Sequence, residues 1–153
     1  MSLGDQIIES IFDVYTCQNS VNQDYIIDTF YNENAVFEDP IIIAHGIRQI
    51  KSQFHSLNSI FSKINVIRET ALEETSLNGK TIVVSNTQIY KIENQFFSKE
   101  ISLDVITSLT FSDEGKIMYH RDVWQQYSFE SPKFLKKLTG MASSFLFRLI
   151  DIK

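Results

Sequence analysis

The sequence predicts an α+β fold in which helices cover one face of a curved antiparallel sheet. Two observations lead to this prediction. The residues before Ser62 repeat apolar side chains at helical spacing, whereas long runs after Ser62 alternate apolar and polar side chains. Short segments such as "ENQF" and "SDEG" separate these runs as hairpin turns do. Helices first and strands afterwards indicate separate layers, not an alternating parallel sheet.

Three helices are expected in the first part of the chain. Residues 4–18 carry an apolar stripe with the spacing of one helix face: Ile7, Ile8, Ile11, Phe12 and Tyr15. Residues 19–33 form the second expected helix, with Asn22 as its N-cap and with Tyr25, Ile26 and Phe30 on its apolar side. A third helix over residues 46–61 aligns Ile47, Ile50, Phe54 and Leu57.

A short strand, Ala35–Glu38, is expected between the second and third helices, and it ends at Asp39. Pro40 has no N–H group and keeps the residue before it extended, so the chain turns there. Four long strands follow Ser62. They are expected over Lys63–Glu74, Thr81–Ile92, Glu100–Phe111 and Lys116–Tyr127.

The face that each strand buries is clear for the third run and ambiguous for the last one. In Glu100–Phe111 the odd residues are apolar except Thr107, so this set, with Leu103 and Val105, is expected to point inward. In the last run, one alternate set comprises Met118, His120, Asp122, Trp124 and Gln126, and the other comprises Ile117, Tyr119, Arg121, Val123 and Tyr127. Periodicity alone does not decide between them. If the first set is inward, a buried carboxylate has an imidazole beside it as a natural partner.

The last 23 residues stand apart from the alternating runs. Residues 131–153 carry five basic residues and one acid, and they read as an amphipathic helix appended to a domain over residues 1–130. Three roles stay open for this helix: docking onto the domain, forming a dimer contact, or touching an anionic membrane surface through residues 132–150.

Composition narrows the possible functions. The chain has 153 residues, enough for one core, and a net charge of −5 that argues against a general nucleic-acid binder. We expect a cytoplasmic protein, because the sequence shows no signal peptide, no apolar run long enough to span a membrane, and Cys17 as its only cysteine. We expect neither a metal site nor a cofactor, because no ligand spacing of the HxxxH kind is present.

The helix pair, "FYNENAVFEDP", a glycine-led third helix and the closing "SDEGKIMYHRDVW" together resemble the nuclear transport factor 2-like superfamily, and within it the SnoaL-like and ketosteroid-isomerase-like domains. The resemblance covers about Asp5 to Gln126. It implies a cone-shaped sheet around a pocket. The pattern of the isomerases implies Asp39 as general base and Tyr15 as oxyanion donor. Thr107 stands where those enzymes have a protonated aspartate, so one oxyanion donor is weaker here.

The resemblance also implies that His120 and Asp122 line the pocket, where related dehydratases and cyclases do acid–base work. The expected catalytic set is then Asp39, His120, Asp122 and Tyr15. The expected substrate-binding set is Thr107, Trp124, Met118, Val105, Leu103, Phe37 and Phe54.

Two functions are consistent with these residues. The first is a homodimeric SnoaL-like protein that binds a hydrophobic small molecule, such as a lipid, steroid or polyketide-like compound, with cofactor-free isomerase or dehydratase chemistry as its activity. The second is a non-catalytic dimerisation or interaction module whose basic C-terminal helix meets a membrane or a partner protein.

Overall fold

The computed structural model describes residues 3–69, 74–75 and 81–125, and it confirms the α+β fold. Its helices are α1 (Leu3–Thr16), α2 (Ser20–Phe30) and α3 (Gly46–Ile60). Its strands are β1 (Tyr31–Glu38), β2 (Ile43–His45), β3 (Lys63–Arg68), β4 (Glu74–Thr75), β5 (Thr81–Glu93), β6 (Ser98–Phe111) and β7 (Ile117–Trp124). The expected turn "SLNGK" and the expected helix over residues 131–153 lie outside the described residues.

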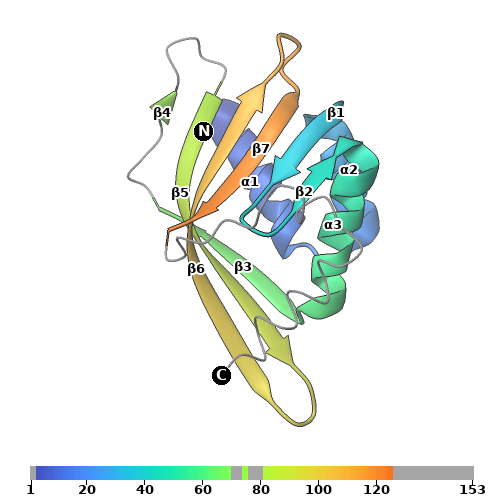
Figure 1. Ribbon diagram of the computed structural model, residues 1–153, viewed down its shortest axis with the longest axis vertical. Helices are drawn as coiled ribbons and strands as arrows, with labels where there is room; N and C mark the ends of the chain where they lie inside the picture. The colour runs from blue at the N-terminus through green and yellow to red at the C-terminus, as the bar shows by residue number, and fades with distance from the viewer. Residues whose placement is uncertain (1–2, 70–73, 76–80, 126–153) are drawn as a thin grey trace.

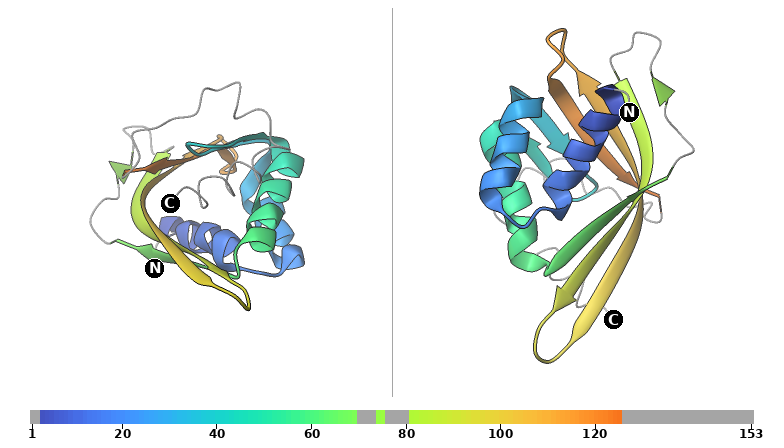
Figure 2. Two further views of the ribbon diagram at one scale, coloured as in Figure 1. Left: turned by 60° about the horizontal axis from the view of Figure 1, so that its bottom comes forward. Right: turned by 180° about the vertical axis from the view of Figure 1, so that it is seen from behind.

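The described strands form one curved sheet in the order β2-β1-β7-β6-β5-β3, with β4 paired to β5. All three helices lie on the same side of this sheet, which curves around α1 (Figures 1 and 2). The inner face of β5, β6 and β7 therefore looks toward α1. The long β5–β6 hairpin extends beyond the helices at one end (Figure 1).

The sheet is not antiparallel throughout. β3, β5, β6 and β7 form the expected antiparallel meander, but β1 pairs with β7 in parallel, with Phe37 opposite His120. The hairpin partner of β1 is the short strand β2, which the sequence analysis did not predict. Strand alternation shows which face is buried but does not show which strand is the neighbour, so this pairing could not be read from it.

The second helix, α2, is shorter than expected, and it buries a different face from the predicted one. It ends at Phe30, and the chain enters β1 at Tyr31. Its N-cap is Asn19, not Asn22, because the Asn19 side chain accepts hydrogen bonds from two backbone N–H groups of the first turn. Tyr25 is exposed, and the buried positions are Gln23 and Ile27. Because Gln23 is polar, apolar periodicity does not indicate that this face of the helix is buried.

A register irregularity at the start of β7 changes which of its residues are buried. Thr110 pairs with Tyr119, but Phe111 pairs with Ile117, so Met118 is the extra residue. Ile117 consequently joins the buried core, whereas Met118 is only half-buried. Strict alternation through β7 predicted the opposite for these two positions.

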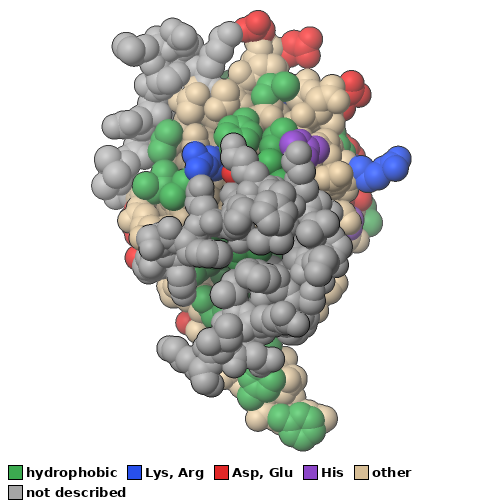
Figure 3. Space-filling model, viewed as in Figure 1, with side chains coloured by type: hydrophobic (Ala, Val, Ile, Leu, Met, Phe, Trp, Pro, Cys, Tyr) green, Lys and Arg blue, Asp and Glu red, His purple; other side chains and the backbone are tan. Residues whose placement is uncertain are grey.

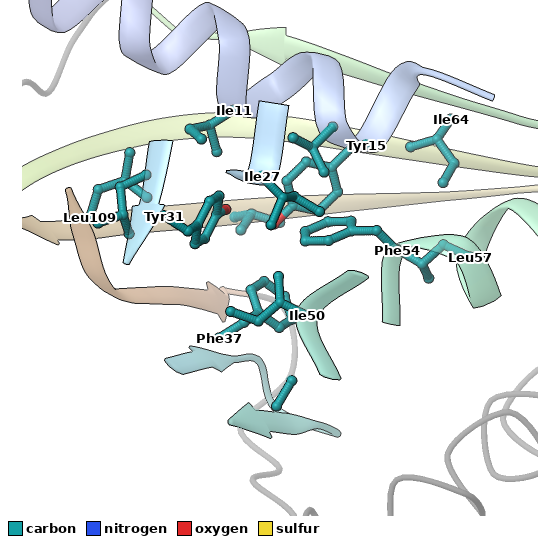
Figure 4. Close-up of a cluster of buried hydrophobic side chains, with 14 of the residues drawn as sticks. Ile11, Tyr15, Ile27, Tyr31, Phe37, Ile50, Phe54, Leu57, Ile64 and Leu109 are labelled. Carbon is teal, nitrogen blue, oxygen red and sulfur yellow. The ribbon is translucent and has the colours of Figure 1, made fainter. Parts of the chain in front are cut away.

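The main core lies between the helices and the inner face of the sheet. Ile11 and Tyr15 of α1 meet Ile27 of α2, Phe54 of α3 and Leu109 of β6 in this cluster (Figure 4). Beside it, Gln23 donates from Nε2 to the Val14 carbonyl at 2.7 Å and accepts from Asn58, so one buried amide connects the three helices. The cluster places aromatic side chains directly against β7.

Hydrophobic side chains also reach the surface at the tip of the β5–β6 hairpin (Figure 3). Phe96 is 86% exposed and Phe97 is 49% exposed. Their backbone N–H groups both donate to Asn94 Oδ1, which holds the turn. Across the described ranges, we find no helix with the length and apolarity needed to cross a membrane.

Candidate functional site

His120 and Asp122 lie on the inner face of β7, and both are buried, His120 completely. The antiparallel register places Thr107 of β6 opposite Asp122 and Leu109 opposite His120. Because residues two apart on a strand share a face, the two polar side chains stand next to each other beneath α1. The distance from His120 Nε2 to Asp122 Oδ1 is 3.4 Å.

The Asp122 carboxylate is surrounded by hydrogen-bond donors. Oδ2 accepts from the Tyr15 hydroxyl at 2.6 Å and from Gln88 Nε2 at 3.2 Å. Oδ1 accepts from the Thr107 hydroxyl at 2.7 Å. A buried carboxylate needs this kind of compensation for the water it has lost. The donors come from α1, β5 and β6, so three separate elements converge on one side chain of a fourth.

Both ring nitrogens of His120 meet tyrosine hydroxyls. Nε2 lies 3.2 Å from the Tyr15 oxygen and Nδ1 lies 2.7 Å from the Tyr31 oxygen. Since Tyr15 donates its only proton to Asp122, Nε2 carries a hydrogen and donates to Tyr15. In the neutral form of His120, Nδ1 accepts from Tyr31. In this form the hydrogen bonds run in one direction, from Tyr31 through His120 and Tyr15 to Asp122. Figure 4 shows the two tyrosine rings reaching toward one another from α1 and β1.

Two more β5 residues, Asn86 and Tyr90, extend this arrangement. Asn86 Nδ2 donates to Thr107 Oγ1 at 2.9 Å, and the Tyr90 hydroxyl donates to Gln88 Oε1. We call the eight connected residues the Asp122 network, which consists of Tyr15, Tyr31, Asn86, Gln88, Tyr90, Thr107, His120 and Asp122.

The protonation of the network follows from burial and charge. Burial by itself raises the pKa of Asp122, but the hydrogen bond of His120, the charge that His120 carries when it is protonated, and hydrogen bonds from Tyr15 and Thr107 outweigh it and leave the pKa lowered. Burial, and next the Asp122 charge, raise the pKa values of Tyr15, Tyr31 and Tyr90 well above their ordinary range. The site therefore combines one ionised carboxylate with three tyrosines that stay protonated at neutral pH.

Apolar side chains surround the network. The Phe37 ring meets the His120 ring edge to face, with centroids 4.9 Å apart, and Phe54 packs in the same way against Tyr15 at 5.0 Å. Leu103 and Val105 are buried on the inner face of β6. These four expected lining residues therefore lie in the core around the network, where a low dielectric strengthens its electrostatic interactions.

Trp124 and Met118 lie at the margins. Trp124 is half-buried against the main core opposite Val105, and Met118 is the irregular residue of β7. The structure brings Tyr15, Thr107, His120 and Asp122 into direct contact.

Asp39 occupies a different position from the network. Its Oδ1 accepts from the backbone N–H groups of Ile41 at 2.8 Å and Ile42 at 2.7 Å, and it thereby holds the turn between β1 and β2. The Asp39 charge is nevertheless felt by Tyr90, whose pKa it helps to raise after burial and Asp122. Asp39 thus holds its turn and lies within electrostatic range of the network.

Four members of the network were missed by sequence reasoning: Tyr31, Asn86, Gln88 and Tyr90. On β5 the inward residues Asn86 and Gln88 alternate with the equally polar Ser85 and Thr87, so polarity does not mark either face. Tyr31 stood at the expected end of a helix. Its position as the first residue of β1, opposite Ile117 in the parallel pair, only emerges from the fold. Within the part of the chain that is described, no cluster of three or more metal-ligating side chains is found.

The arrangement of elements matches that of solved structures. A SnoaL-like family protein from Agrobacterium tumefaciens, a candidate isomerase, superposes with a TM-score of 0.66 and 12% identity over 82% of this chain and 99% of its own. A ketosteroid isomerase-like protein from Catenulispora acidiphila, in complex with trimethylamine, has a TM-score of 0.61 and 13% identity over 76% of this chain and 83% of its own.

The chain has the nuclear transport factor 2-like fold. An epoxide hydrolase/cyclase-like enzyme with a role in pyran-ring formation in the polyether salinomycin shares it, with a TM-score of 0.61 and 19% identity over 81% of this chain and 94% of that enzyme. Neither a protein-family model nor a curated protein sequence matches the chain. At these identities the likeness concerns the nuclear transport factor 2-like fold alone, so function has to be argued from the site.

Proposed function

We propose that the protein binds a hydrophobic small molecule with an acidic C–H or O–H group and moves a proton on it without a cofactor. The observation that carries this proposal is the continuous chain of hydrogen bonds that joins Tyr31, His120, Tyr15 and Asp122, which runs in one direction toward Asp122 when His120 is neutral. Such a chain can take up a proton at one end while its charge is stabilised at the other.

The proton acceptor in this proposal is His120, reached through Tyr31. When the ligand gives a proton to the Tyr31 oxygen, Tyr31 passes its own proton to His120 Nδ1 over 2.7 Å. Tyr31 stays neutral throughout, which agrees with its raised pKa. The imidazolium is then held by the ionised Asp122 at 3.4 Å. The return of the proton to a different ligand atom completes an isomerisation.

Asp122 is a positioning residue in this scheme, since its two oxygens already accept from Tyr15, Gln88 and Thr107. Asp39 provides an alternative base in the pattern of the isomerases, and its charge lies within range of Tyr90. The two versions differ in which substitution abolishes turnover.

The test is deuterium uptake at the α-carbon of a panel of apolar cyclic ketones, followed by NMR in D₂O. Removal of the Tyr31 hydroxyl in Tyr31→Phe should slow exchange by about 10²–10⁴-fold, the usual contribution of general acid–base catalysis. Tyr25→Phe is the matched control, because Tyr25 is exposed. Exchange that is unchanged in Tyr31→Phe but lost in Asp39→Asn would assign the base to Asp39.

A second candidate is a non-catalytic interaction module, and the exposed Phe96 and Phe97 favour it. A homodimer and a membrane contact through residues 132–150 belong to this proposal. Analytical ultracentrifugation tests the dimer. Liposome co-sedimentation, with and without residues 131–153, tests the membrane contact. Absence of ketone exchange together with liposome binding that needs residues 131–153 would favour the module over the enzyme.

A further inference from the structure

Asn86 occupies a buried position between two apolar clusters. It lies on the inner face of β5 and has no exposed surface. Its neighbour on the same face, Val84, belongs to a small cluster with Ile8 and Phe12 of α1, which is distinct from the main core. The amide of Asn86 is therefore a buried polar group that lies between the Asp122 network and this small apolar cluster.

The orientation of this amide is determined by its partners. Ionised Asp122 can only accept, so Thr107 gives its proton to Asp122 Oδ1 and has only acceptor capacity left. Asn86 must then present its NH₂ group to Thr107, as it does at 2.9 Å. The reverse orientation would set two acceptors against each other. Asn86 Oδ1 consequently points away from Thr107, and the network holds it there.

Asn86 Oδ1 is buried, and no donor reaches it among the described residues. Buried side-chain acceptors are nearly always satisfied, because the loss of water without a replacement hydrogen bond is unfavourable. The other amide of the inner face, Gln88, shows the contrast, since its Oε1 accepts from Tyr90 and its Nε2 donates to Asp122. One acceptor is thus held in place without a donor from the described part of the chain.

We propose that Asn86 Oδ1 accepts a hydrogen bond from a hydroxyl or amide N–H group of the bound ligand. This inference rests on the proposed function and narrows its substrate class to apolar molecules that carry a neutral hydrogen-bond donor. A neutral donor suits the position better than a cation, because Asp122 is already compensated by its own donors and a buried cation would lose its hydration.

The experiment compares bicyclic alcohols with their O-methyl ethers, which keep the apolar body and remove the donor. Affinities for the full-length protein are measured by isothermal titration calorimetry. Wild type should bind the alcohols at least about tenfold more tightly than the ethers, since a site built around a hydrogen bond rejects the analogue that lacks it. Asn86→Leu should bind both classes equally, and the exposed Asn65→Leu serves as the matched control.

A second measurement needs no variant. In ¹⁵N-labelled wild type, the chemical shift of the Asn86 side-chain NH₂ group should change when an alcohol is added and stay the same when an ether is added. The reason is that a hydrogen-bond donor on Oδ1 polarises the amide. Equal affinities for alcohol and ether in wild type, or discrimination that survives in Asn86→Leu, would overturn the inference and leave the proposed function intact. If wild type binds neither the alcohols nor the ethers, both the inference about Asn86 and the proposed function are refuted. A water that stays on Oδ1 in a crystal structure with bound alcohol would also refute the inference.

Discussion

Replacement of Asp122 by asparagine tests whether the hydrogen-bond donors around Asp122 depend on the two oxygens of its ionised carboxylate. An amide has one acceptor oxygen where the carboxylate has two. If that oxygen faces Tyr15 and Gln88, Thr107 loses its acceptor. In the reverse orientation, Tyr15 and Gln88 lose theirs. At least one buried donor is stranded, at about 1–3 kcal/mol, and the remaining bonds lose their charge assistance. Together with the loss of the partner for His120, we expect about 3–5 kcal/mol of destabilisation.

Urea denaturation followed by circular dichroism measures this loss. With a slope of about 1–3 kcal/mol per molar, a loss of about 3 kcal/mol shifts the midpoint by about 1–3 M. Asp24→Asn is the matched control, because Asp24 pairs with His55 at 2.8 Å on a half-exposed surface, where such pairs contribute less than about 1 kcal/mol. A loss in Asp122→Asn no larger than that of Asp24→Asn would refute the view that these donors depend on the charge.

The same variant has a pH signature. The folded state lowers the pKa of Asp122, so the stabilising contribution of its ionisation is complete above the unfolded value of about 4 and is lost as the pH falls below it. The stability difference between wild type and Asp122→Asn should therefore shrink as the pH is lowered through about 4. A difference that grows on acidification would contradict the lowered pKa.

Three further predictions concern other parts of the fold. The buried tyrosines of the network have raised pKa values, so their contribution to stability is complete below about pH 10 and is lost above it. The phenolate absorbance of Tyr15, Tyr31 and Tyr90 should rise together with unfolding, not before it. Gln23→Ala should lower the free energy of unfolding in urea denaturation by about 1–3 kcal/mol, because the Val14 carbonyl loses its donor and Asn58 Nδ2 keeps only one of its two acceptors, the Cys17 carbonyl. The exposed Gln6→Ala should stay within about 0.5 kcal/mol. Gly115→Ala should lower the free energy of unfolding by about 1–2 kcal/mol, because its φ of 76° is unfavourable for a residue with a Cβ. Gly46→Ala should lower the melting temperature more than Gly115→Ala does, because its added carbon would also lie 3.3 Å from the Glu33 carbonyl oxygen.

Much of the fold could be predicted because long periodic segments carry a strong signal. The runs over Thr81–Ile92 and Glu100–Phe111 differ from β5 and β6 by at most two residues at an end. The third helix was equally clear from its spacing. The buried face of the second helix was predicted wrongly, because one of its buried residues is the polar Gln23. Its hydrogen bond to the Val14 carbonyl stabilises the fold but leaves no apolar periodicity in the sequence.

The candidate site was only partly predictable, for a related reason. His120 and Asp122 stood out as two polar residues between Met118 and Trp124 in one alternate set, and the resemblance to ketosteroid-isomerase-like domains added Tyr15 and Thr107. Tyr31 could not be found, since its contact with His120 depends on a parallel strand pair between segments 89 residues apart. Long-range pairings of this kind follow from the packing of the whole chain and leave no local pattern.

The position of Asp122 on the last described strand has a consequence for the order of folding. Its contact with Tyr15 spans 107 residues, and those with Gln88 and Thr107 span 34 and 15. During synthesis the donors on α1, β5 and β6 are all complete before the acceptor that joins them is made. Contacts between distant segments close slowly, because the chain between them must first be ordered. The docking of β7 between β1 and β6 therefore completes the sheet and the Asp122 network in a single late step.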